Sequence, residues 1–245
     1  MKKISILILS LAIFTACQAE PEVEKGEKIV IPQESSQLLM VTTDNWNTKD
    51  GMLQRYERDG KSWKKVGEPI DIVLGRNGLG WGIGLHTTPK DAKYIKKEGD
   101  GKAPAGLFAL GNGFGYEDFE IDFPYSVYKR TDHCVDDSKS KFYNTIIDST
   151  KVKKDYKSFE HMKLKNDLYK YGITVNHNPN NIANAGSCIF VHIRNKKGGG
   201  TAGCTAMRED KIVKILKWLK RSKKPLLLQL PKTEVAKKIA NNSLK

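Results

Sequence analysis

The chain has 245 residues, and its 42 lysines and arginines against 28 aspartates and glutamates give a formal net charge of +14. This length suits one domain with a core of its own, and we find no internal repeat. The charge favours an anionic partner, although a lysine-rich solvated surface explains it equally well. The histidines and cysteines show no metal-ligand spacing, so we expect neither a metal site nor a cofactor.

The N-terminus has the parts of an export signal. Met1 to Lys3 is basic, Ile4 to Phe14 is an apolar run, and a Thr-Ala-Cys sequence ends at Cys17. A membrane-spanning helix needs ~20 residues, so this run is too short for a permanent anchor. We therefore predict a lipoprotein signal peptide over residues 1–16 with lipidation at Cys17, and ordinary cleavage near Ala19 is the alternative.

These features predict an exported, periplasmic protein that is attached to a membrane through an N-terminal lipid anchor. Gln18 is not the aspartate that commonly retains lipoproteins in the inner membrane, so we expect attachment to the outer membrane. Export argues against nucleic acid as a partner. Residues 17–36 are rich in Glu, Lys, Pro and Ser, which predicts a disordered tether between the lipid and the domain.

Residues 37–231 are expected to form one domain that opens with β-strands. Strand-like segments cover 37–42, 52–56 and 62–66, and Asp59-Gly60 between the last two is a two-residue hairpin signal. Further strands are expected over 69–74, 121–128, 173–177, 189–194 and 226–230, and helices over 158–171 and 207–221. The predicted fold class is therefore mainly β with peripheral helices, as a sandwich or closed mixed sheet, followed by a polar tail over 232–245.

Glycine-rich runs over 78–84 and 111–115 lack the final spacing of the dinucleotide-binding fingerprint. At Gly60-Lys61-Ser62, Arg55 stands where a phosphate loop needs glycine. We therefore expect no nucleotide site. These glycines mark turns or leave room for a ligand near Trp81.

A candidate base and a candidate thiol nucleophile lie on either side of a glycine-rich turn. Ile189 to Arg194 alternates as a half-buried strand does, and it carries His192. The glycines that end at Gly200 reverse the chain and return Cys204 to the strand it left. We therefore predict a Cys/His catalytic pair. The alternative is a buried structural cysteine and a core histidine that share no chemistry.

The residues after Cys204 predict a helix, because apolar side chains recur at helical spacing and Glu209 and Asp210 occupy the expected first turn. Cys204 would then lie just ahead of a helix N-terminus. The positive end of the helix dipole favours thiolate, which lowers a thiol pKa that starts near ~8.5. We therefore expect a reactive thiol.

These residues resemble the catalytic domain of the YkuD-like L,D-transpeptidases, whose signature is a strand-borne His, a variable stretch and Ser/Thr-x-Gly-Cys. Gly186 to His192 is similar to the branch in which Gly-Ser-x-Ile-Phe precedes the catalytic His, and 101–108 resembles the Gly/Pro-rich stretch before the core. Two positions depart from the pattern. Ala202 replaces a second His, and Thr205-Ala206 replaces an apolar residue and an Arg that would clamp a carboxylate.

The resemblance implies a cysteine acyltransferase that acts on peptidoglycan stem peptides. Cys204 would attack the carbonyl of the third stem residue and release D-alanine, with His192 as general base and acid. The thioester would pass to a side-chain amine of a neighbouring stem, or to a protein that becomes attached to the wall. Water as the acceptor would make the enzyme a carboxypeptidase or endopeptidase, and a non-catalytic wall-binding lipoprotein is the third class.

Supporting roles are expected for three further residues. The amides of Gly203 and Cys204 are candidates for holding the oxyanion, because glycine lets a ligand approach the backbone. Thr201 would orient the base or the substrate, or else close the turn through its own hydroxyl. His177 is a candidate to support the site from outside, with a structural role as the alternative.

The cysteine count bears on the same assignment. If Cys17 carries lipid, three cysteines remain in an oxidising compartment, and an odd thiol is a candidate nucleophile. The pair that remains would be Cys134 and Cys188, joined in a disulfide that would help to fix the strand carrying His192. Two buried free thiols are the alternative.

Overall fold

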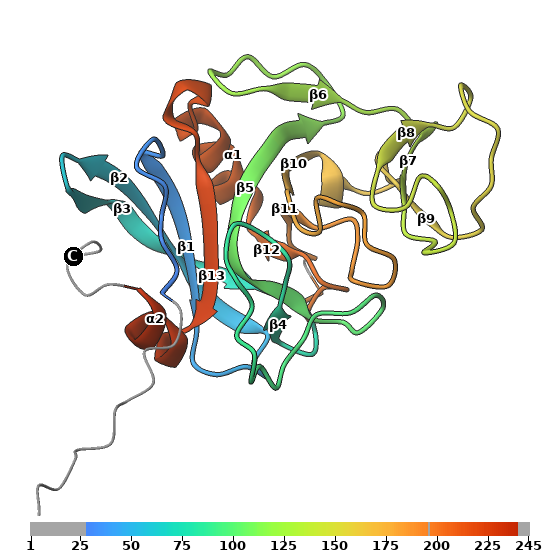
Figure 1. The fold of residues 1–245 in the computed structure, drawn as a ribbon. Helices are drawn as coiled ribbons and strands as arrows, with labels where there is room; N and C mark the ends of the chain where they lie inside the picture. The colour runs from blue at the N-terminus through green and yellow to red at the C-terminus, as the bar shows by residue number, and fades with distance from the viewer. Residues whose placement is uncertain (1–27, 196, 240–245) are drawn as a thin grey trace, which may run out of the picture.

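A mixed β-sheet that closes on itself organises the described part of the chain, which comprises residues 28–195 and 197–239 of a computed structural model. Strands are paired in the ring β5-β10-β11-β12-β3-β2-β1-β13-β5, since β10 pairs with both β11 and β5. The prediction of a mainly β fold with peripheral helices is confirmed (Figure 1). The predicted signal peptide, Cys17 and most of the predicted tether lie outside the described residues.

The strands are β1 (Gln37–Thr43), β2 (Asp50–Asp59), β3 (Ser62–Val73), β4 (Leu79–Trp81), β5 (Ala103–Gly115), β6 (Tyr125–Val127), β7 (Asp132–Val135), β8 (Ile146–Asp148), β9 (Phe159–His161), β10 (Tyr171–Val175), β11 (Phe190–Ile193), β12 (Thr205–Met207) and β13 (Leu226–Pro231). The helices are α1 (Glu209–Trp218) and α2 (Lys232–Lys238), with single 3-10 turns at Asp167–Tyr169 and Arg221–Lys223. None of the helices in the described ranges is long and apolar enough to cross a membrane.

The long strand β5 closes the sheet because its two halves pair with different neighbours. Residues 106–109 pair with β13, and the far end, 113–115, pairs with β10. The close approach of β10 to β5 depends on Gly172 of β10, because a Cβ at this position would overlap the ring of Phe114. The glycines over 111–115, which were expected to mark a turn or to leave room for a ligand, lie in β5 because β10 and β6 pair with this end of the strand on its two sides.

The main core fills the ring and continues under α1. Side chains of β1, β5 and β13 such as Leu38, Phe108 and Leu228 are fully buried. One face of α1 adds Ile212, Ile215 and Leu216, which recur at helical spacing and pack beside β10 and β11. Helix α1 therefore backs the strand that carries His192.

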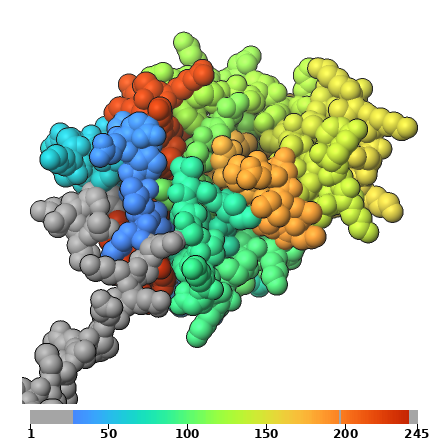
Figure 2. Space-filling model, viewed as in Figure 1, coloured from blue at the N-terminus to red at the C-terminus, as the bar shows by residue number. Residues whose placement is uncertain are grey.

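A side lobe, residues 131–162, carries β7, β8 and β9 as a separate three-stranded sheet, at the right of Figure 1. It forms the yellow bulge beside the orange segment in Figure 2. The helix predicted over residues 158–171 is wrong. Phe159 stacks on His133 of β7 with ring centroids 3.9 Å apart, and the segment pairs with β7, so tertiary packing overrides the apolar spacing.

Described residues on both sides of the predicted domain, 37–231, pack against it. Residues 28–36 were expected in the tether, yet Ile29 is buried and its amide donates to Lys238 O at 3.0 Å. Arg58 holds the same segment by donating to Ser35 O at 2.8 Å and to Pro32 O at 2.9 Å. In the predicted polar tail, α2 packs against β13 and β1. The described ends of the chain thus pack on the domain.

Candidate active site

His192 and Cys204 lie on neighbouring strands or at their ends. Strand β11 carries His192, and Cys204 immediately precedes β12, which runs parallel to β11 with Val191 opposite Thr205. The turn between them is fixed to the end of β3. The Thr201 amide donates to Leu74 O at 2.8 Å, and Arg76 donates back to Thr201 O at 2.9 Å. Both side chains line one cavity of about 210 Å³.

The thiol of Cys204 is held between two backbone groups. Its Sγ accepts the amide of Phe190 at 3.3 Å and donates to Cys188 O at 3.6 Å. Only 5% of the residue is exposed. Burial raises the pKa of the Cys204 thiol, and the nearby charge of Glu160 raises this pKa further. The resting nucleophile is therefore a protonated thiol.

The expectation of a thiolate stabilised by a helix N-terminus is wrong. Helix α1 begins at Glu209, and β12 lies between it and Cys204. Residues 205–207 pair with Val191 to Ile193, which keeps the chain extended beyond the thiol before the helix can start. The acidic first turn of α1 therefore lies away from Cys204 in sequence, and the dipole effect falls off within one turn.

The imidazole of His192 is neutral at physiological pH. Burial lowers its pKa to about 4, against the opposing effect of the carbonyls of Ile193 and Leu168. Its Nδ1 lies 2.8 Å from Ile193 O, and because a carbonyl can only accept, Nδ1 carries the proton of the neutral ring. Nε2 is then the basic nitrogen, so the ring can accept a proton.

Two residues that sequence analysis missed complete the same cavity. The ring of Tyr169 meets the ring of His192 edge to face at 5.1 Å, and its hydroxyl donates to Glu160 Oε2 at 2.5 Å. Burial raises the pKa of Glu160 to about 7. No motif marked either residue, because both fall in the segment that was predicted as a helix. Glu160 reaches the site from β9 of the side lobe, and Tyr169 reaches it from the 3-10 turn that contacts β11.

Thr201 closes the turn, which is the second of its two predicted roles. Its hydroxyl accepts the amide of Gly203 at 3.1 Å and donates to Cys204 O at 2.6 Å. The Gly203 amide is therefore already bonded within the turn. Of the two predicted oxyanion donors, this leaves the amide of Cys204.

A disulfide joins Cys134 to Cys188, with an S–S distance of 2.06 Å. It links β7 of the side lobe to the segment that enters β11. Asn144 reinforces the link, because its Oδ1 accepts the Cys188 amide at 3.0 Å. The carbonyl of Cys188 in turn accepts the thiol of Cys204, so the bridge acts directly on the position of the nucleophile.

His177 takes the structural alternative. Its side chain is buried, its Nε2 lies 3.0 Å from Ala185 O, and its Nδ1 accepts the amide of Ile83 at 3.3 Å. Burial lowers its pKa to about 4. The cavity with Cys204 and His192 is lined by other residues. His177 thus holds the loop before Gly186 and does not reach the candidate pair.

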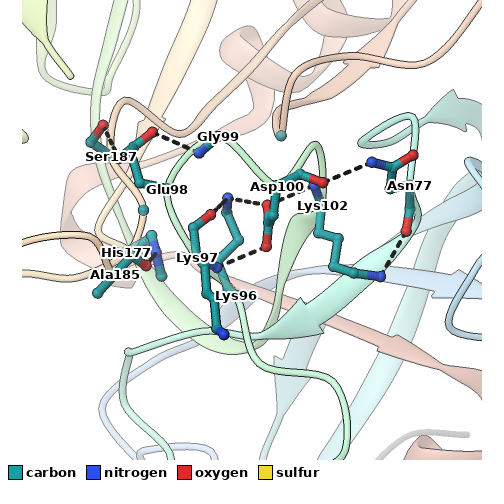
Figure 3. A network of polar contacts seen from close by, with 12 residues as sticks. Asn77, Lys96, Lys97, Glu98, Gly99, Asp100, Lys102, His177, Ala185 and Ser187 are labelled. Carbon is teal, nitrogen blue, oxygen red and sulfur yellow. Dashed lines mark hydrogen bonds and ion pairs between the residues drawn. The ribbon is translucent and has the colours of Figure 1, made fainter. Parts of the chain in front are cut away.

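A buried ion pair, also missed, lies under the turn. Lys96 Nζ donates to Asp100 Oδ1 at 2.7 Å and to Lys97 O at 2.7 Å, and its side chain is 3% exposed. A Cβ at Gly203 would lie 3.8 Å from this ammonium, whose charge lowers the pKa of Cys204 and so opposes Glu160. Figure 3 shows the pair with Glu98 and Ser187 on one side and Asn77 and Lys102 on the other.

A second cavity of about 610 Å³ adjoins the first and shares Leu168 and Asn195 with it. Its lining includes the cations Arg194, Lys197 and Arg208. It also includes the carboxylates Asp167, Glu209 and Asp210. The two cavities together offer room for an extended ligand that passes the thiol, with charged groups of both signs along its path.

No family profile matches the chain, and no curated protein matches it. Among solved structures, the chain is similar to the helical cell shape determining protein Pgp2 from Campylobacter jejuni, at 13% identity and a TM-score of 0.43. A substituted form of Pgp2 gives 14% identity and a TM-score of 0.44. Each match covers 84% of this chain and 51% of the other, so this chain spans about half the length of the structures it matches.

Proposed function

We propose that the chain is a cysteine acyltransferase of the L,D-transpeptidase type that acts on peptidoglycan stem peptides. The observation that carries the proposal is the pairing of β11 with β12, which brings His192 and Cys204 to one cavity. A thiol and a neutral histidine that line one cavity supply the nucleophile and the base that acyl transfer needs. The resemblance of the sequence around both residues to the L,D-transpeptidase signature supplies the substrate class.

The reaction begins from a neutral pair. In the complex, His192 Nε2 takes the thiol proton as Cys204 Sγ attacks the carbonyl carbon of the third stem residue. The oxyanion accepts the amide of Cys204. The carbon–nitrogen bond to D-alanine then breaks, and the imidazolium returns its proton to the departing amine. A thioester on Cys204 is left.

The second half of the reaction transfers the acyl group. An amine of a neighbouring stem attacks the thioester carbon, His192 takes the proton released, and the carbon–sulfur bond breaks. Cys204 Sγ is restored as a thiol when it recovers that proton. Water in place of the amine yields a free carboxylate, so hydrolysis is the second outcome of the same site, and a protein amine would attach that protein to the wall.

We also propose that residues 1–16 direct export and that lipid at Cys17 anchors the chain to the outer membrane, facing the wall. A basic exported domain suits a wall polymer that carries carboxylates. Arg194 and Arg208 in the larger cavity can take the place of the carboxylate clamp that Thr205-Ala206 lacks, because a guanidinium binds carboxylates through paired donors.

Trapping the thioester tests the proposal. The full chain with Cys17→Ser is incubated with a tetrapeptide whose third residue is a diamino diacid, and its intact mass is followed. We expect a transient adduct equal to the peptide without its D-alanine, absent in the additional Cys204→Ala variant and slower to form in His192→Gln. If no adduct and no D-alanine appear, the non-catalytic wall-binding class replaces the enzyme.

A further inference from the structure

Glu160 is the one residue with a charged carboxylate, ammonium or guanidinium group among the described residues that line the smaller cavity. It lies on β9, opposite Cys134 of β7, so the disulfide to Cys188 ties it to the backbone that holds the thiol. The rest of the lining is apolar or uncharged apart from the candidate pair. The side lobe therefore presents a single carboxylate to the nucleophile.

Only one oxygen of this carboxylate is engaged. Oε2 accepts the Tyr169 hydroxyl at 2.5 Å, which fixes the group beside the ring that packs on His192. Oε1 accepts no hydrogen bond from any described residue, and it is not fully buried. Because Glu160 lines the smaller cavity, Oε1 is available to accept a hydrogen bond from a ligand there.

By itself this carboxylate works against the nucleophile. Its charge raises the pKa of Cys204, which burial has already raised. Asp136 and Glu98 raise the pKa of Glu160 in turn, but less than burial does, while Lys96 acts on the thiol in the opposite direction. A structural partner for Tyr169 would not need a charge, so a cationic ligand explains the placement better.

We propose that Glu160 is a specificity-determining residue whose Oε1 binds an ammonium group on the substrate peptide. This inference rests on the proposed function. The ammonium and the carboxylate form an ion pair without a proton transfer, and the charge beside Cys204 is neutralised when the substrate binds. Substrate binding therefore favours transfer of the thiol proton to His192, and peptides without the amine are disfavoured.

Charged thiol reagents test this inference without any peptidoglycan reaction. The assay is run at pH 8.5, where Glu160 is ionised because burial raises its pKa only to about 7. In the full chain with Cys17→Ser, Cys204 is modified with aminoethyl methanethiosulfonate, which is cationic, or with its anionic sulfonatoethyl counterpart. Rates are divided by those of the same reagents with a small free thiol. We expect Cys204 to react about tenfold faster with the cationic reagent, because a single carboxylate at short range in a partly screened site attracts it. Glu160→Gln should abolish this preference.

Two further variants separate charge from packing. Glu68→Gln removes the same charge from an exposed position on β3 and should leave the preference unchanged. Tyr169→Phe removes the hydrogen bond between the two side chains but keeps the carboxylate, so it should retain the preference. Comparing this variant with Glu160→Gln therefore separates loss of the charge from a defect in packing. Equal rates for the two reagents in the parent chain, or loss of the preference in Tyr169→Phe alone, would overturn the proposal.

The substrate itself gives the second readout. The readout is D-alanine release during acylation of Cys204, because acetylation also removes the amine as an acceptor in the second half of the reaction. We expect the tetrapeptide with its side-chain amine acetylated to need about a tenfold higher concentration for half-maximal acylation than the free amine, and Glu160→Gln to remove that difference. Turnover that depends on Cys204 but ignores acetylation overturns the role of Glu160 and leaves the proposed function standing. If there is no turnover but the reagent assay still shows a cation preference, the proposed peptide substrate is wrong and the cation site at Glu160 stands.

Discussion

The amide of Phe190 donates to Cys204 Sγ across 3.3 Å, only two residues before His192. The strand that supplies the base therefore also holds the nucleophile. Because the Cys188 carbonyl accepts the same sulfur, the thiol is fixed from both sides by one stretch of backbone. That stretch is anchored by the disulfide to the side lobe, so the position of Cys204 depends on contacts far away in sequence.

The raised pKa of Cys204 predicts a thiol that is slow to alkylate without substrate. A raised pKa means that the protonated form persists above the ordinary cysteine value of about 8.5, so the rate with iodoacetamide should still be rising at pH 9. The measurement is the alkylation rate against pH in the Cys17→Ser chain. A plateau below pH 8 would show that the resting site already holds a thiolate.

Thr201→Val should weaken the turn at the nucleophile. It removes the acceptor of the Gly203 amide and the donor to Cys204 O, two hydrogen bonds that are each worth about 1 kcal/mol. We expect a loss of about 2 kcal/mol in urea denaturation, together with a lower kcat. Thr201→Ser keeps the hydroxyl and is the matched control. If both variants behave alike, the hydroxyl is not what holds the turn.

Lys96→Met should leave Asp100 charged and unpaired beneath Gly203. Removing one partner of a buried pair typically costs about 3 kcal/mol or more. The double variant Lys96→Met, Asp100→Asn should recover part of this loss, because it leaves no lone charge and keeps an acceptor for one of the amides of Lys97 and Lys102 that Asp100 holds. Denaturation of the two single variants and the double variant measures the coupling. Additive losses would show that the pair does not act as a unit.

Loss of the disulfide should destabilise the chain by about 4 kcal/mol in the loop-entropy model, for a bridge with a sequence separation of 54. The test compares denaturation midpoints of the double variant Cys17→Ser, Cys204→Ala with and without reductant, so that no free protein thiol can exchange with the bridge. Reduction should also release the side lobe and expose Glu160. Unchanged stability after complete reduction would mean that hydrogen bonds such as Asn144 to Cys188 suffice.

Acid should destabilise the fold through its buried histidines. The pKa values of His192 and His177 are each lowered to about 4, so between about pH 6.5 and pH 4 the unfolded chain binds more protons than the native one. Stability is then full above pH 6.5 and falls by up to about 3 kcal/mol per histidine by pH 4. Glu160, with a raised pKa, acts in the opposite direction, so the readout is the difference in pH slope between the parent chain and His192→Gln. Parallel slopes would contradict the burial of His192.

The part of the site that could be predicted from sequence is local. The alternation over β11 and the glycine-rich turn are short-range signals, and they suffice to predict that His192 and Cys204 return to one place. The fold class followed from the same kind of pattern. The closed sheet itself depends on β5, whose glycines over 111–115 are typical of a turn or of space for a ligand but are held extended by β10 and β6.

Other parts of the site depend on long-range contacts that no local pattern carries. Glu160 reaches the cavity because β9 pairs with β7, and Lys96 reaches the turn from a loop that is distant in sequence. The predicted start of the helix was too close to Cys204, because the short strand β12 lies between them. The helical spacing of the apolar residues after Cys204 gives no sign that β12 pairs with β11. For Glu160 and for the helix the missing information is a strand pairing, and for Lys96 it is a buried ion pair.

The most direct test of the central claim is to give tetrapeptide muropeptides to the full chain with Cys17→Ser and to identify the products by mass spectrometry. The account predicts cross-linked dimers with loss of D-alanine, absent when Cys204 is alanine. Tripeptides without dimers would assign the same thioester to hydrolysis. Products that are unchanged by Cys204→Ala, or no product at all, would contradict a cysteine enzyme of the wall.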